Sequence, residues 1–560
     1  MTGCKIVFSG ENSIEVQFEQ KICIEVNRMV FEFAKLFEEA AVEISGVKIE
    51  EIVPTYCAVT VYFDCAENED KGRKKILEAA RWILDRVLSD GEKKTENSGR
   101  IVKIPVCYDD EEFAPDLKDV ALNAGLSQKE VVRIHSSTDY LIYMLGFLPG
   151  FAYLGGLDPR LETPRLKTPR TKIQAGSVAI GGSQTGLYPV DSPGGWRIIG
   201  RTPLKVFSQF RNPAFLYSAG DKIRFVPVTR REFDEFDELD WLEKNGYLEN
   251  KMSSPKKTVR FVCGGGAKII DGGLLTTVQD FGRKGFQKYG IGESGAMDKK
   301  SLALANALVK NDLNAACLET TLCGPELEFS SDCVFAITGA ELNASLDGKT
   351  VAMNTAVRAS AGSVLKCGFA VKGLRSYIAF SGGILVPPVF GSASTNVKSG
   401  MGGYGGKLVK GGQLAFGESL YDLKNSEFNS SSLNIENEKI EIKDDENSPL
   451  VLKVLPGAQY DFFDKKIIEK FTSTVYEVSS ESDRMGIRFL GNSLDCGKTD
   501  IISDAIPFGA VQITSSGLPV VMAADRQTTG GYAKIATVLQ RSMRELAQAR
   551  PGKKVRFVFC

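Results

Sequence analysis

Histidine is the scarcest functional residue in this sequence of 560 residues, because the chain contains only His135. Zinc sites of the usual kind draw on several histidines or on paired cysteines. The twelve cysteines are scattered and include no C-x-x-C pair, so no zinc site is expected. Acid and base chemistry must then depend mainly on carboxylates, lysine, tyrosine or the single imidazole.

An excess of charge of one sign is also lacking. The 69 basic and 70 acidic residues leave a net charge of -1, which offers no general attraction to nucleic acid or to an anionic membrane. No apolar run reaches the roughly 18 residues that a membrane span needs, and the start MTGCKIVFSGENS lacks the features of a secretory signal. We therefore expect a soluble protein of the reducing cytoplasm that binds neither nucleic acid nor membrane.

The common nucleotide and hydrolase motifs are missing as well. There is no Walker A sequence, and the nearest match, SGMGGYGGKLV, has Met401 in place of the first glycine and Leu408 after the lysine. There is no G-x-S-x-G elbow either. The glycine cluster is interpreted either as a plain loop or as a loop that closes over a ligand. Any bound ATP is then expected to be held by other glycine turns, backbone N–H groups and Arg or Lys side chains.

Apolar periodicity predicts a small α+β unit at the start of the chain. Helices are expected over about 26–40 and 76–87, with a strand at 57–63 between them. The only strong helix signal in the second half is 298–312, which Asp298 would cap. Two charge-dense segments without clear periodicity, 230–257 and 424–449, predict connectors, although the first has apolar spacing that would suit a short acidic helix.

From about residue 101 onward, short apolar strands broken by Gly and Pro are typical of barrels or sandwiches. The pattern G-x-x-[ILV]-x-F predicts the closing strand of three β units, and it occurs in GDKIRF (220–225), GGQLAF (411–416) and GKKVRF (552–557). A second repeat favours a shared fold for the two halves of the chain. It aligns GSVAI (176–180) with GAVQI (509–513), and GGWRIIGRTPL (194–204) with GGYAKIATVL (530–539).

Candidate site residues in the first half surround the single histidine. A lone histidine is most often structural, but His135 leads into a loop rich in glycine and aromatic residues. The following segment concentrates positive charge at Arg165, Lys167, Arg170 and Lys172. Such a cluster suits a phosphate or carboxylate group, and it equally suits a solvated loop.

Candidate site residues in the second half are acids and bases set among glycine turns. Acids in such turns bind Mg²⁺ or orient water, and arginines hold phosphate or carboxylate groups. Aspartate and arginine neighbours in loops can also bond only to the nearby backbone, so both interpretations stay open. The residues are Asp280, Arg283, Asp298, Glu319, Lys398, Asp483, Arg484, Asp525, Arg526 and Gln527.

Long motifs resemble a known family. The segments GFLPGFAYLGGLDPRLETPRLKTPR and AGSVAIGGSQTGLYPVDSPGGWRIIGRTPL resemble the B subunit of 5-oxoprolinase, also called Kip inhibitor or allophanate hydrolase subunit 1. TTVQDFGRKGFQKYGIGESGAMD and DRQTTGGYAKIATV resemble its C subunit, the Kip antagonist or allophanate hydrolase subunit 2. The chain thus resembles a fusion of the two subunits, related to urea carboxylase carboxyltransferase. Asn396 departs from the family pattern, where an acid is expected, and weakens a metal role for its loop.

The resemblance implies a mainly β fold with α+β, in which cyclophilin-like β-barrel domains are repeated behind a small N-terminal ferredoxin-like α+β domain. The expected parts are 1–95 (small α+β domain), 101–229 (barrel of the B-like half), 230–258 (fusion joint), 259–420 (first β domain of the C-like half), 421–449 (connector) and 450–560 (second cyclophilin-like domain).

The resemblance also implies ATP-dependent opening of 5-oxo-L-proline to L-glutamate together with the A subunit of 5-oxoprolinase, a separate chain. We expect this chain to bind 5-oxoproline and Mg-ATP and to phosphorylate the lactam oxygen. Two alternatives stay open: a Kip-type regulator that binds a sensor histidine kinase, and a biotin-dependent carboxyltransferase or allophanate-related enzyme. A homo-oligomer is left open too.

The resemblance and the residue patterns together assign candidate roles. The expected catalytic residues are His135, Asp280, Asp298 and Asp525. The expected substrate- or nucleotide-binding residues are Arg165, Lys167, Arg170, Gln184, Arg283, Glu319, Lys398, Asp483, Arg484, Arg526 and Gln527. No metal ligand is assigned, although Mg²⁺ is expected to accompany ATP.

Overall fold

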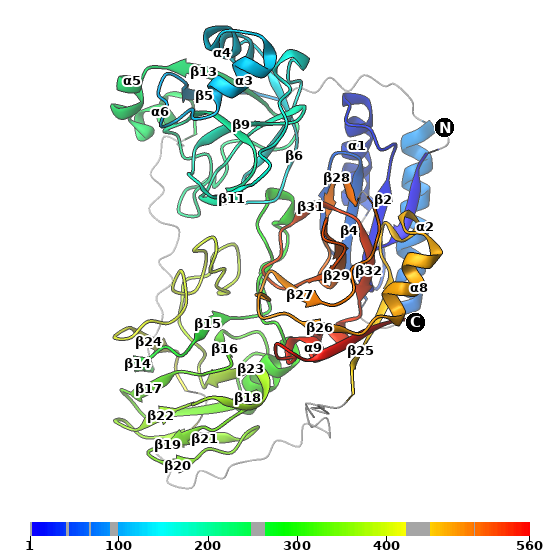
Figure 1. The fold of residues 1–560 in the computed structure, drawn as a ribbon. Coiled ribbons are helices and arrows are strands. Elements are labelled where there is room, and N and C mark those ends of the chain that lie inside the picture. The colour runs from blue at the N-terminus through cyan, green and yellow to red at the C-terminus, as the bar shows by residue number, and fades with distance from the viewer. Residues whose placement is uncertain are drawn as a thin grey trace.

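The structure is a computed structural model that describes residues 3–40, 44–65, 69–89, 99–247, 264–419, 421, 448–497 and 499–560. These residues form an N-terminal α+β unit, a first closed barrel, a two-sheet unit and a second closed barrel (Figure 1). The predicted fold class, mainly β with α+β and repeated cyclophilin-like barrels, is confirmed. No helix in the described part is long and apolar enough to cross a membrane.

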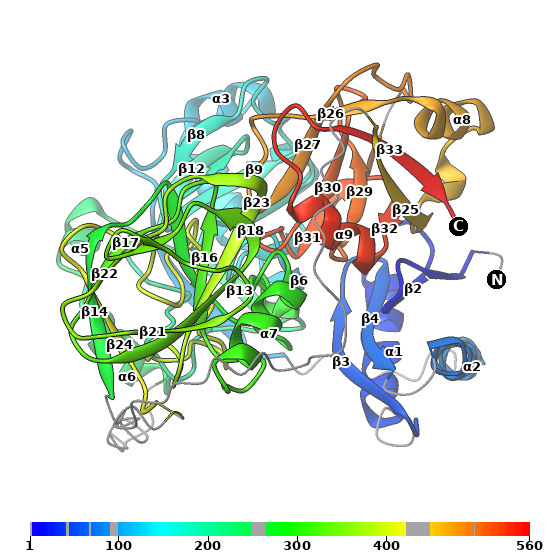
Figure 2. The ribbon, with the colours of Figure 1, turned by 90° about the horizontal axis from the view of Figure 1, so that it is seen from below.

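The N-terminal unit is an antiparallel sheet of order β1-β2-β4-β3 with two helices on one face (Figure 2). Both predicted helices and the predicted strand are confirmed, and Phe33, Phe37 and Val59 are fully buried between the layers. The ferredoxin-like label for this unit stays a prediction. Its elements are β1 (Lys5–Phe8), β2 (Ser13–Gln17), α1 (Ile24–Ala40), β3 (Val47–Pro54), β4 (Ala58–Cys65) and α2 (Glu69–Ser89).

The first barrel closes in the order β10-β7-β6-β13-β5-β12-β9, and its last strand, β13, pairs in parallel with its first, β5. Its elements are β5 (Ile101–Cys107), α3 (Leu117–Ala124), α4 (Gln128–Ser136), β6 (Tyr140–Leu145), β7 (Ala152–Gly155), β8 (Arg170–Ile173), β9 (Ser177–Gly181), β10 (Gln184–Leu187), β11 (Ser192–Gly194), β12 (Arg197–Arg201) and β13 (Lys222–Val228). A two-stranded ribbon of β8 and β11 projects from it.

The segment predicted as a fusion joint is partly structured. Helices α5 (Arg230–Asp234) and α6 (Glu238–Lys244) follow the barrel, and Thr229 caps α5 through a capping box. Leu242 and Tyr247 are buried against the barrel core, so this part of 230–258 belongs to the barrel. The short acidic helix that the apolar spacing suited is present as α5 and α6, and only the interpretation of this part as a plain connector does not hold. The rest of the joint, from residue 248, lies outside the described residues.

The second barrel repeats this strand order as β30-β27-β26-β33-β25-β32-β29, again closed by a parallel pair, β33 with β25. Its elements are β25 (Leu450–Pro456), α8 (Lys465–Ser473), β26 (Tyr476–Val478), β27 (Gly486–Leu490), β28 (Asp500–Ala505), β29 (Ala510–Ile513), β30 (Pro519–Met522), β31 (Thr529–Tyr532), β32 (Lys534–Val538), α9 (Gln540–Ala547) and β33 (Lys554–Phe559). Its projecting ribbon, β28 with β31, matches β8 with β11.

The repeats found in the sequence coincide with this duplication. GDKIRF and GKKVRF contain β13 and β33, the closing strands of the two barrels. GSVAI and GAVQI contain β9 and β29, which pair with the next repeated strands, β12 and β32. GGQLAF contains β24, which pairs antiparallel with β14 in an open sheet, so its unit is not a third closed barrel.

The two-sheet unit holds its core between sheets of order β20-β19-β22-β17-β14-β24 and β15-β16-β23-β18-β21. Asp298 accepts the Ser301 N–H and caps α7, as predicted. The elements are β14 (Gly265–Asp271), β15 (Leu275–Gln279), α7 (Lys299–Leu308), β16 (Cys317–Thr321), β17 (Glu326–Phe329), β18 (Cys333–Leu342), β19 (Ser345–Leu346), β20 (Lys349–Thr350), β21 (Ala356–Ala359), β22 (Val364–Lys366), β23 (Ala370–Phe380) and β24 (Gln413–Phe416). The predicted connector 421–449 lies almost entirely outside the described residues.

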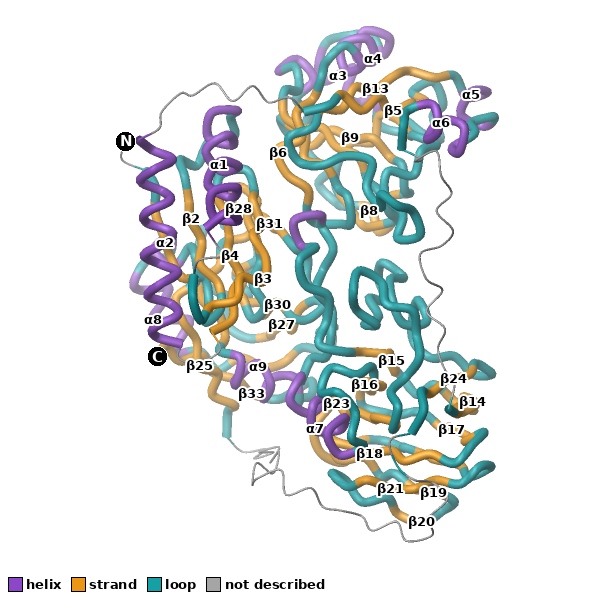
Figure 3. Tube along the Cα trace, turned by 180° about the vertical axis from the view of Figure 1, so that it is seen from behind, coloured by secondary structure: helices purple, strands orange, loops and turns teal. Residues whose placement is uncertain are grey.

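Parts that are far apart in the sequence lie side by side. The N-terminal sheet packs against the second barrel, where the Thr537 hydroxyl donates to the Ser9 carbonyl at 2.7 Å (Figure 2). The connection between β15 and α7 touches the other three units (Figure 3). In this connection Tyr289 accepts from Gly150 of the first barrel at 2.8 Å, the Lys288 N–H donates to Glu51 at 3.0 Å, and the Ser294 N–H donates to Ala524 of the second barrel at 3.1 Å.

Candidate functional site

A cavity of about 300 Å³, here called the junction cavity, lies where the two barrels meet the two-sheet unit. Corresponding loops of both barrels line it: the β6–β7 and β26–β27 loops supply Leu148 and Met485, and the β10–β11 and β30–β31 loops supply Asp191 and Arg526. The two-sheet unit adds Arg283, Gly290–Gly292 and Asn396–Met401. The volume falls at the lower end of the range for small-molecule sites, about 300–1,000 Å³.

Three buried polar groups around the junction cavity have no hydrogen-bond partner among the described residues. They are Nη1 of Arg283, Nη1 of Arg526 and Oγ1 of Thr528, in residues that are 1%, 3% and 1% exposed. Burying such a group unpaired costs about 1–3 kcal/mol, and more for a charged one. All three groups belong to residues that line this one cavity.

The other donors of the two arginines hold the guanidinium groups in place. Arg283 donates to the backbone carbonyls of Ser394 and Val389, and burial lowers its pKa. Gly402, with φ of +70°, leaves the space for that side chain, since a Cβ there would lie 2.7 Å from Nη2 of Arg283. Arg526 donates through Nε to the Ile506 carbonyl at 2.8 Å. The free Nη1 groups therefore belong to positioned side chains.

A buried ionic cluster behind the cavity joins the second barrel to the two-sheet unit. Arg484 binds Asp525 through Nε at 2.9 Å and Nη2 at 3.1 Å, and its Nη1 binds Glu319. The other Glu319 oxygen accepts from the Tyr377 hydroxyl at 2.8 Å. Burial alone would lower the pKa of Arg484, but the two carboxylates outweigh it and raise the pKa. Arg484 and Glu319 thus hold Asp525 and the loop that carries Arg526.

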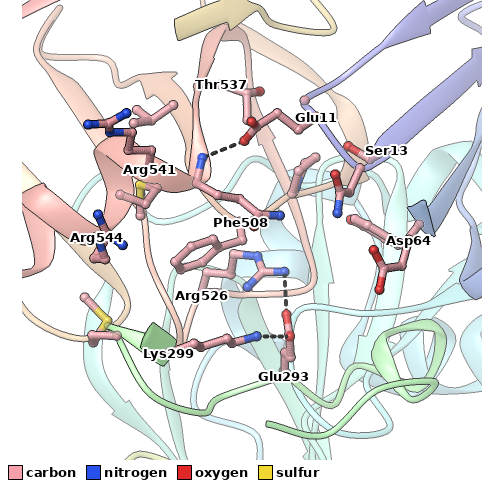
Figure 4. A pocket seen from close by; sticks show the side chains of 18 of the residues that line it. Glu11, Ser13, Asp64, Glu293, Lys299, Phe508, Arg526, Thr537, Arg541 and Arg544 are labelled. Carbon is pink, nitrogen blue, oxygen red and sulfur yellow. Dashed lines mark hydrogen bonds and ion pairs between the residues drawn. The ribbon is translucent and has the colours of Figure 1, made fainter. Parts of the chain in front are cut away.

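A second cavity, here called the α9 cavity, has a volume of about 470 Å³ and lies between the N-terminal unit, the start of α7 and helix α9 (Figure 4). Arg526 lines both cavities, so its guanidinium lies where they adjoin. Glu293 accepts from Lys299 at 2.8 Å and from Arg526 at 3.5 Å. Burial alone would raise the pKa of Glu293, but these cations outweigh it and lower the pKa to about 2.

The predicted site residues divide into groups. The junction cavity brings together Arg283, Lys398, Asp525, Arg526 and Gln527, and Asp298 lines the α9 cavity. Asp483 lies beside the first group, paired with Lys398 at 3.0 Å. Asp280 is occupied by hydrogen bonds from Gly282, Ser392, Ala393 and Ser394, which pin the loop beside the cavity.

His135 lies in neither cavity. It is fully buried in the first barrel, where Nδ1 is 2.9 Å from the Tyr108 hydroxyl and Nε2 is 2.8 Å from the Thr185 hydroxyl. Burial lowers its pKa to about 3, so the ring is neutral near pH 7. Its predicted catalytic role is not tested by these contacts, but the geometry gives it a packing function and no exposed nitrogen.

The remaining predicted binding residues of the first half also lie away from both cavities. Arg170 forms a bidentate pair with Asp116 at 2.8 and 2.9 Å, and Gln184 donates to the Tyr56 hydroxyl at 2.7 Å. Arg165 lies over the Trp196 ring, and Lys167 is exposed. None of these four side chains lines either cavity of the described residues, and their binding roles stay predictions.

Sequence reasoning missed several lining residues. The loop YPVDSP carried no predicted site role, yet Val190–Pro193 line the junction cavity from the position that DRQTT occupies in the second barrel. The repeat itself could have identified this correspondence. Lys299, Lys300, Arg541 and Arg544 of the α9 cavity carried no motif, because three units that are distant in sequence form that cavity.

The described residues do not fit a Mg²⁺ site made of protein ligands alone. They contain no group of three or more His, Cys, Asp or Glu side chains that could hold a metal ion. The two acids that line the junction cavity are already bonded, Asp525 to Arg484 and Asp191 to Lys172 and the Ala175 N–H. Mg²⁺ that arrives with ATP keeps mainly phosphate and water ligands, so no reaction step is assigned to the ion.

Known proteins match both halves of the chain. The family model described as "Carboxyltransferase domain, subdomain C and D" matches residues 4–217, and "Carboxyltransferase domain, subdomain A and B" matches residues 289–559. Their order is the one that the two resembling segments predicted.

Three proteins of known sequence or structure are similar to this chain. The C subunit of 5-oxoprolinase from Escherichia coli (strain K12) is 39% identical over 295 residues, which are 52% of this chain and 91% of that protein. The B subunit of 5-oxoprolinase from Bacillus subtilis (strain 168) is 38% identical over 232 residues, 41% of this chain and 95% of that protein. The crystal structure of TTHA0988 covers 98% of this chain and 99% of its own, with a TM-score of 0.75 and 28% identity. The chain belongs to the family of the 5-oxoprolinase B and C subunits, and it carries both in one polypeptide.

Proposed function

We propose that this chain is a 5-oxoprolinase component that binds 5-oxo-L-proline in the junction cavity and activates it with ATP for hydrolysis to L-glutamate. The observation that carries the proposal is the set of unpaired buried donors around that cavity, at Arg283, Arg526 and Thr528. The relatives named as B and C subunits of 5-oxoprolinase support the choice of substrate.

The ligand and the cavity are complementary in chemistry. 5-oxoproline is a five-membered lactam with one carboxylate, so it presents an anion, a carbonyl oxygen and an apolar ring face. Guanidinium groups pair with carboxylates in a bidentate manner, which suits Arg283 or Arg526. Apolar side chains complete the wall, among them Leu148, Ile291 and Met485. A small, partly apolar cavity with a few converging donors is the usual design of a specific small-molecule site.

ATP is required because an unstrained lactam is resonance-stabilised and its ring closure is favoured by entropy. In the proposed step the lactam oxygen attacks the γ-phosphorus of ATP, so one P–O bond forms, the bond to the β-phosphate oxygen breaks, and ADP leaves. A first water then adds to the activated carbon and the ring C–N bond breaks, with a proton passing to the nitrogen, which leaves an acyl phosphate. A second water hydrolyses this acyl phosphate to the free carboxylate and phosphate. Arg526 stabilises the negative charge that the phosphoryl oxygens carry in the first step.

We assign the completion of hydrolysis to the separate A subunit of 5-oxoprolinase, which the names of the relatives support only indirectly. The test is release of ADP by the purified chain, with and without 5-oxoproline and with and without that added subunit. Release that depends on 5-oxoproline but not on the A subunit is expected. ADP that appears only after the A subunit is added would disprove this division of labour.

Carboxyl transfer is the second candidate, because the matching family models are described as carboxyltransferase domains. Such an enzyme takes its carboxyl group from carboxylated biotin. Incubation of the chain with carboxybiotin and 5-oxoproline, followed by mass spectrometry, separates the two reactions. Loss of the carboxyl group from carboxybiotin without any effect of ATP would favour the second candidate. The regulatory, kinase-binding alternative stays a prediction.

A further inference from the structure

Cationic side chains line one side of the α9 cavity, and a carboxylate lies on the other side. Lys299, Lys300, Arg541 and Arg544 lie on the side formed by α7 and α9, and Asp64 of the N-terminal unit lies on the opposite side. Figure 4 shows Arg541 and Arg544 next to each other, with Arg526 and Lys299 below them and Asp64 across the cavity. A ligand that fits such a cavity carries an anionic part at one end and hydrogen-bond donors at the other.

The basic wall holds four cationic side chains, of which Lys299 is paired with a carboxylate. Glu293 is shared between Lys299 and Arg526, and the Asp298 carboxylate caps α7. The guanidinium groups of Arg541 and Arg544 form no ion pair within the described part of the chain. Burial and the charges of these two arginines lower the pKa of Lys300. Like charges held this close repel one another, and a polyanion between them would relieve the repulsion.

The side chains, and not the helix end, make this site. The N–H of Gln540, the first residue of α9, has no acceptor within the helix. It donates instead to a carboxylate oxygen of Glu11 at 2.5 Å. A second observation comes from Arg526, which is 3% exposed and lines the same cavity with Nη1 unpaired. The volume of about 470 Å³ also lies within the range of nucleotide-sized small-molecule sites.

We propose that the α9 cavity binds a polyphosphate chain, with the phosphates against Lys299, Lys300, Arg541 and Arg544. This proposal deepens the proposed function, on which it rests for the identity of the reaction. A nucleoside triphosphate suits the whole cavity, because its ribose hydroxyls donate hydrogen bonds and Asp64 on the opposite side accepts them. Inorganic polyphosphate has the same anionic groups. The experiment below distinguishes a nucleoside triphosphate from inorganic polyphosphate.

The position of Arg526 gives the proposal a mechanistic consequence. Because this residue lines both cavities, a terminal phosphate in the α9 cavity and a lactam in the junction cavity would contact the same side chain. Three units build the α9 cavity, from both the B-like and the C-like halves of the chain. Phosphate binding would then require both halves together, which gives a physical reason for joining them in one polypeptide.

The test is isothermal titration calorimetry on the full chain with three probes: the β,γ-imido analogue of ATP, inorganic tripolyphosphate and AMP. The wild-type chain is expected to bind the analogue with an affinity that falls as salt is raised, and not to bind AMP. Equal affinity for tripolyphosphate would identify a plain polyphosphate site, and weaker affinity would identify a nucleotide site. A wild-type chain that binds neither the analogue nor tripolyphosphate overturns the proposal.

The decisive variant is Arg541→Ala combined with Arg544→Ala, expected to weaken binding of the analogue at least about tenfold. The double lysine variant at the same positions should restore most of the affinity. The matched control is Lys554→Ala with Arg556→Ala, which removes two exposed charges of β33 in the same barrel. Unchanged affinity in the Arg541 and Arg544 variant would disprove the site. Binding of 5-oxoproline, titrated on the same samples, should be unaffected, and its absence in every sample would count against the proposed function instead.

Discussion

The two barrels have the same strand order but carry different residues in their connections. Both close with a parallel pair and both project a two-stranded ribbon. In the first barrel His135 stacks on Phe225 of the closing strand, at 4.8 Å between centroids, and in the second Phe471 stacks on Phe557 at 4.6 Å. The single histidine of the chain thus occupies the place of a core aromatic residue.

The connections distinguish the barrels in function. The loop between β30 and β31 places Arg526 between two cavities, whereas the corresponding loop of the first barrel contributes Asp191, which pairs with Lys172 at 2.9 Å. The second barrel has helix α9 between β32 and β33, and the described segment between β12 and β13 contains no helix. The strands of the duplication therefore supply the scaffold, and the loops of its second copy supply most of the charged site.

The largest effect is expected at Arg526. Arg526→Ala removes a buried cation from the junction of both cavities and should reduce kcat/KM about 100- to 1000-fold in an ADP-release assay with the A subunit present. Asp191→Ala, in the corresponding loop of the first barrel, should cause a far smaller loss. Equal losses in both variants would show that the two loops contribute alike and would contradict the comparison.

The next largest effect is expected on the free energy of unfolding. It tests whether His135 and Phe471 occupy equivalent places in the cores of the two barrels. Phe471→Ala should lower the free energy of unfolding by about 3–5 kcal/mol, as expected for a buried ring. His135→Phe should retain the packing and lose about 1–3 kcal/mol, because the Tyr108 hydroxyl loses its bond to Nδ1. Urea unfolding measures both values, and turnover of His135→Phe at saturating substrate should match the wild type. A large loss of turnover in a stably folded variant would restore a catalytic role for His135.

A smaller effect is expected on how the stability of the fold changes with pH. The pKa of Glu293 is lowered from 4.5 to about 2 in the folded chain, so this group stabilises the fold above its ordinary pKa and loses that contribution as pH falls from about 4.5 toward 2. Glu293→Gln removes the titrating carboxylate. The urea midpoint of the variant should therefore fall less steeply between pH 5 and pH 3 than that of the wild type. Parallel pH curves for the two proteins would argue against the ion pairs at Glu293.

The smallest effect is expected in the basic segment of the first barrel. Arg165→Ala with Lys167→Ala changes exposed side chains that line neither cavity and should alter stability by less than about 0.5 kcal/mol. Affinity for the ATP analogue should be unchanged, as measured by calorimetry. A clear loss of affinity would move the phosphate site from the second barrel to the first.

Much of the fold could be predicted from local patterns, because helix periodicity, the Asp298 cap and the repeated closing strands each reflect neighbours in sequence. The pattern of acids and bases among glycine turns identified Arg283, Asp525 and Arg526 as candidates, but it did not predict that they meet in one cavity. The α9 cavity could not be predicted, since Glu11, Lys299 and Arg541 come from three units whose packing leaves no periodic signal. The apolar spacing of 230–257 suited a short helix, but the burial of Leu242 and Tyr247 against the barrel depends on residues that are distant in sequence.

The proposed function depends on binding of 5-oxoproline by Arg283 and Arg526, whose Nη1 groups have no partner among the described residues. Equilibrium dialysis with labelled 5-oxoproline measures this binding without turnover. The wild-type chain is predicted to bind one molecule per chain, and Arg283→Ala to bind at least about tenfold more weakly at the same fold stability. Met485→Trp, which fills the cavity from the second barrel, should also abolish binding. Undiminished binding by both variants, or no saturable binding by the wild type, would contradict the assignment of this cavity.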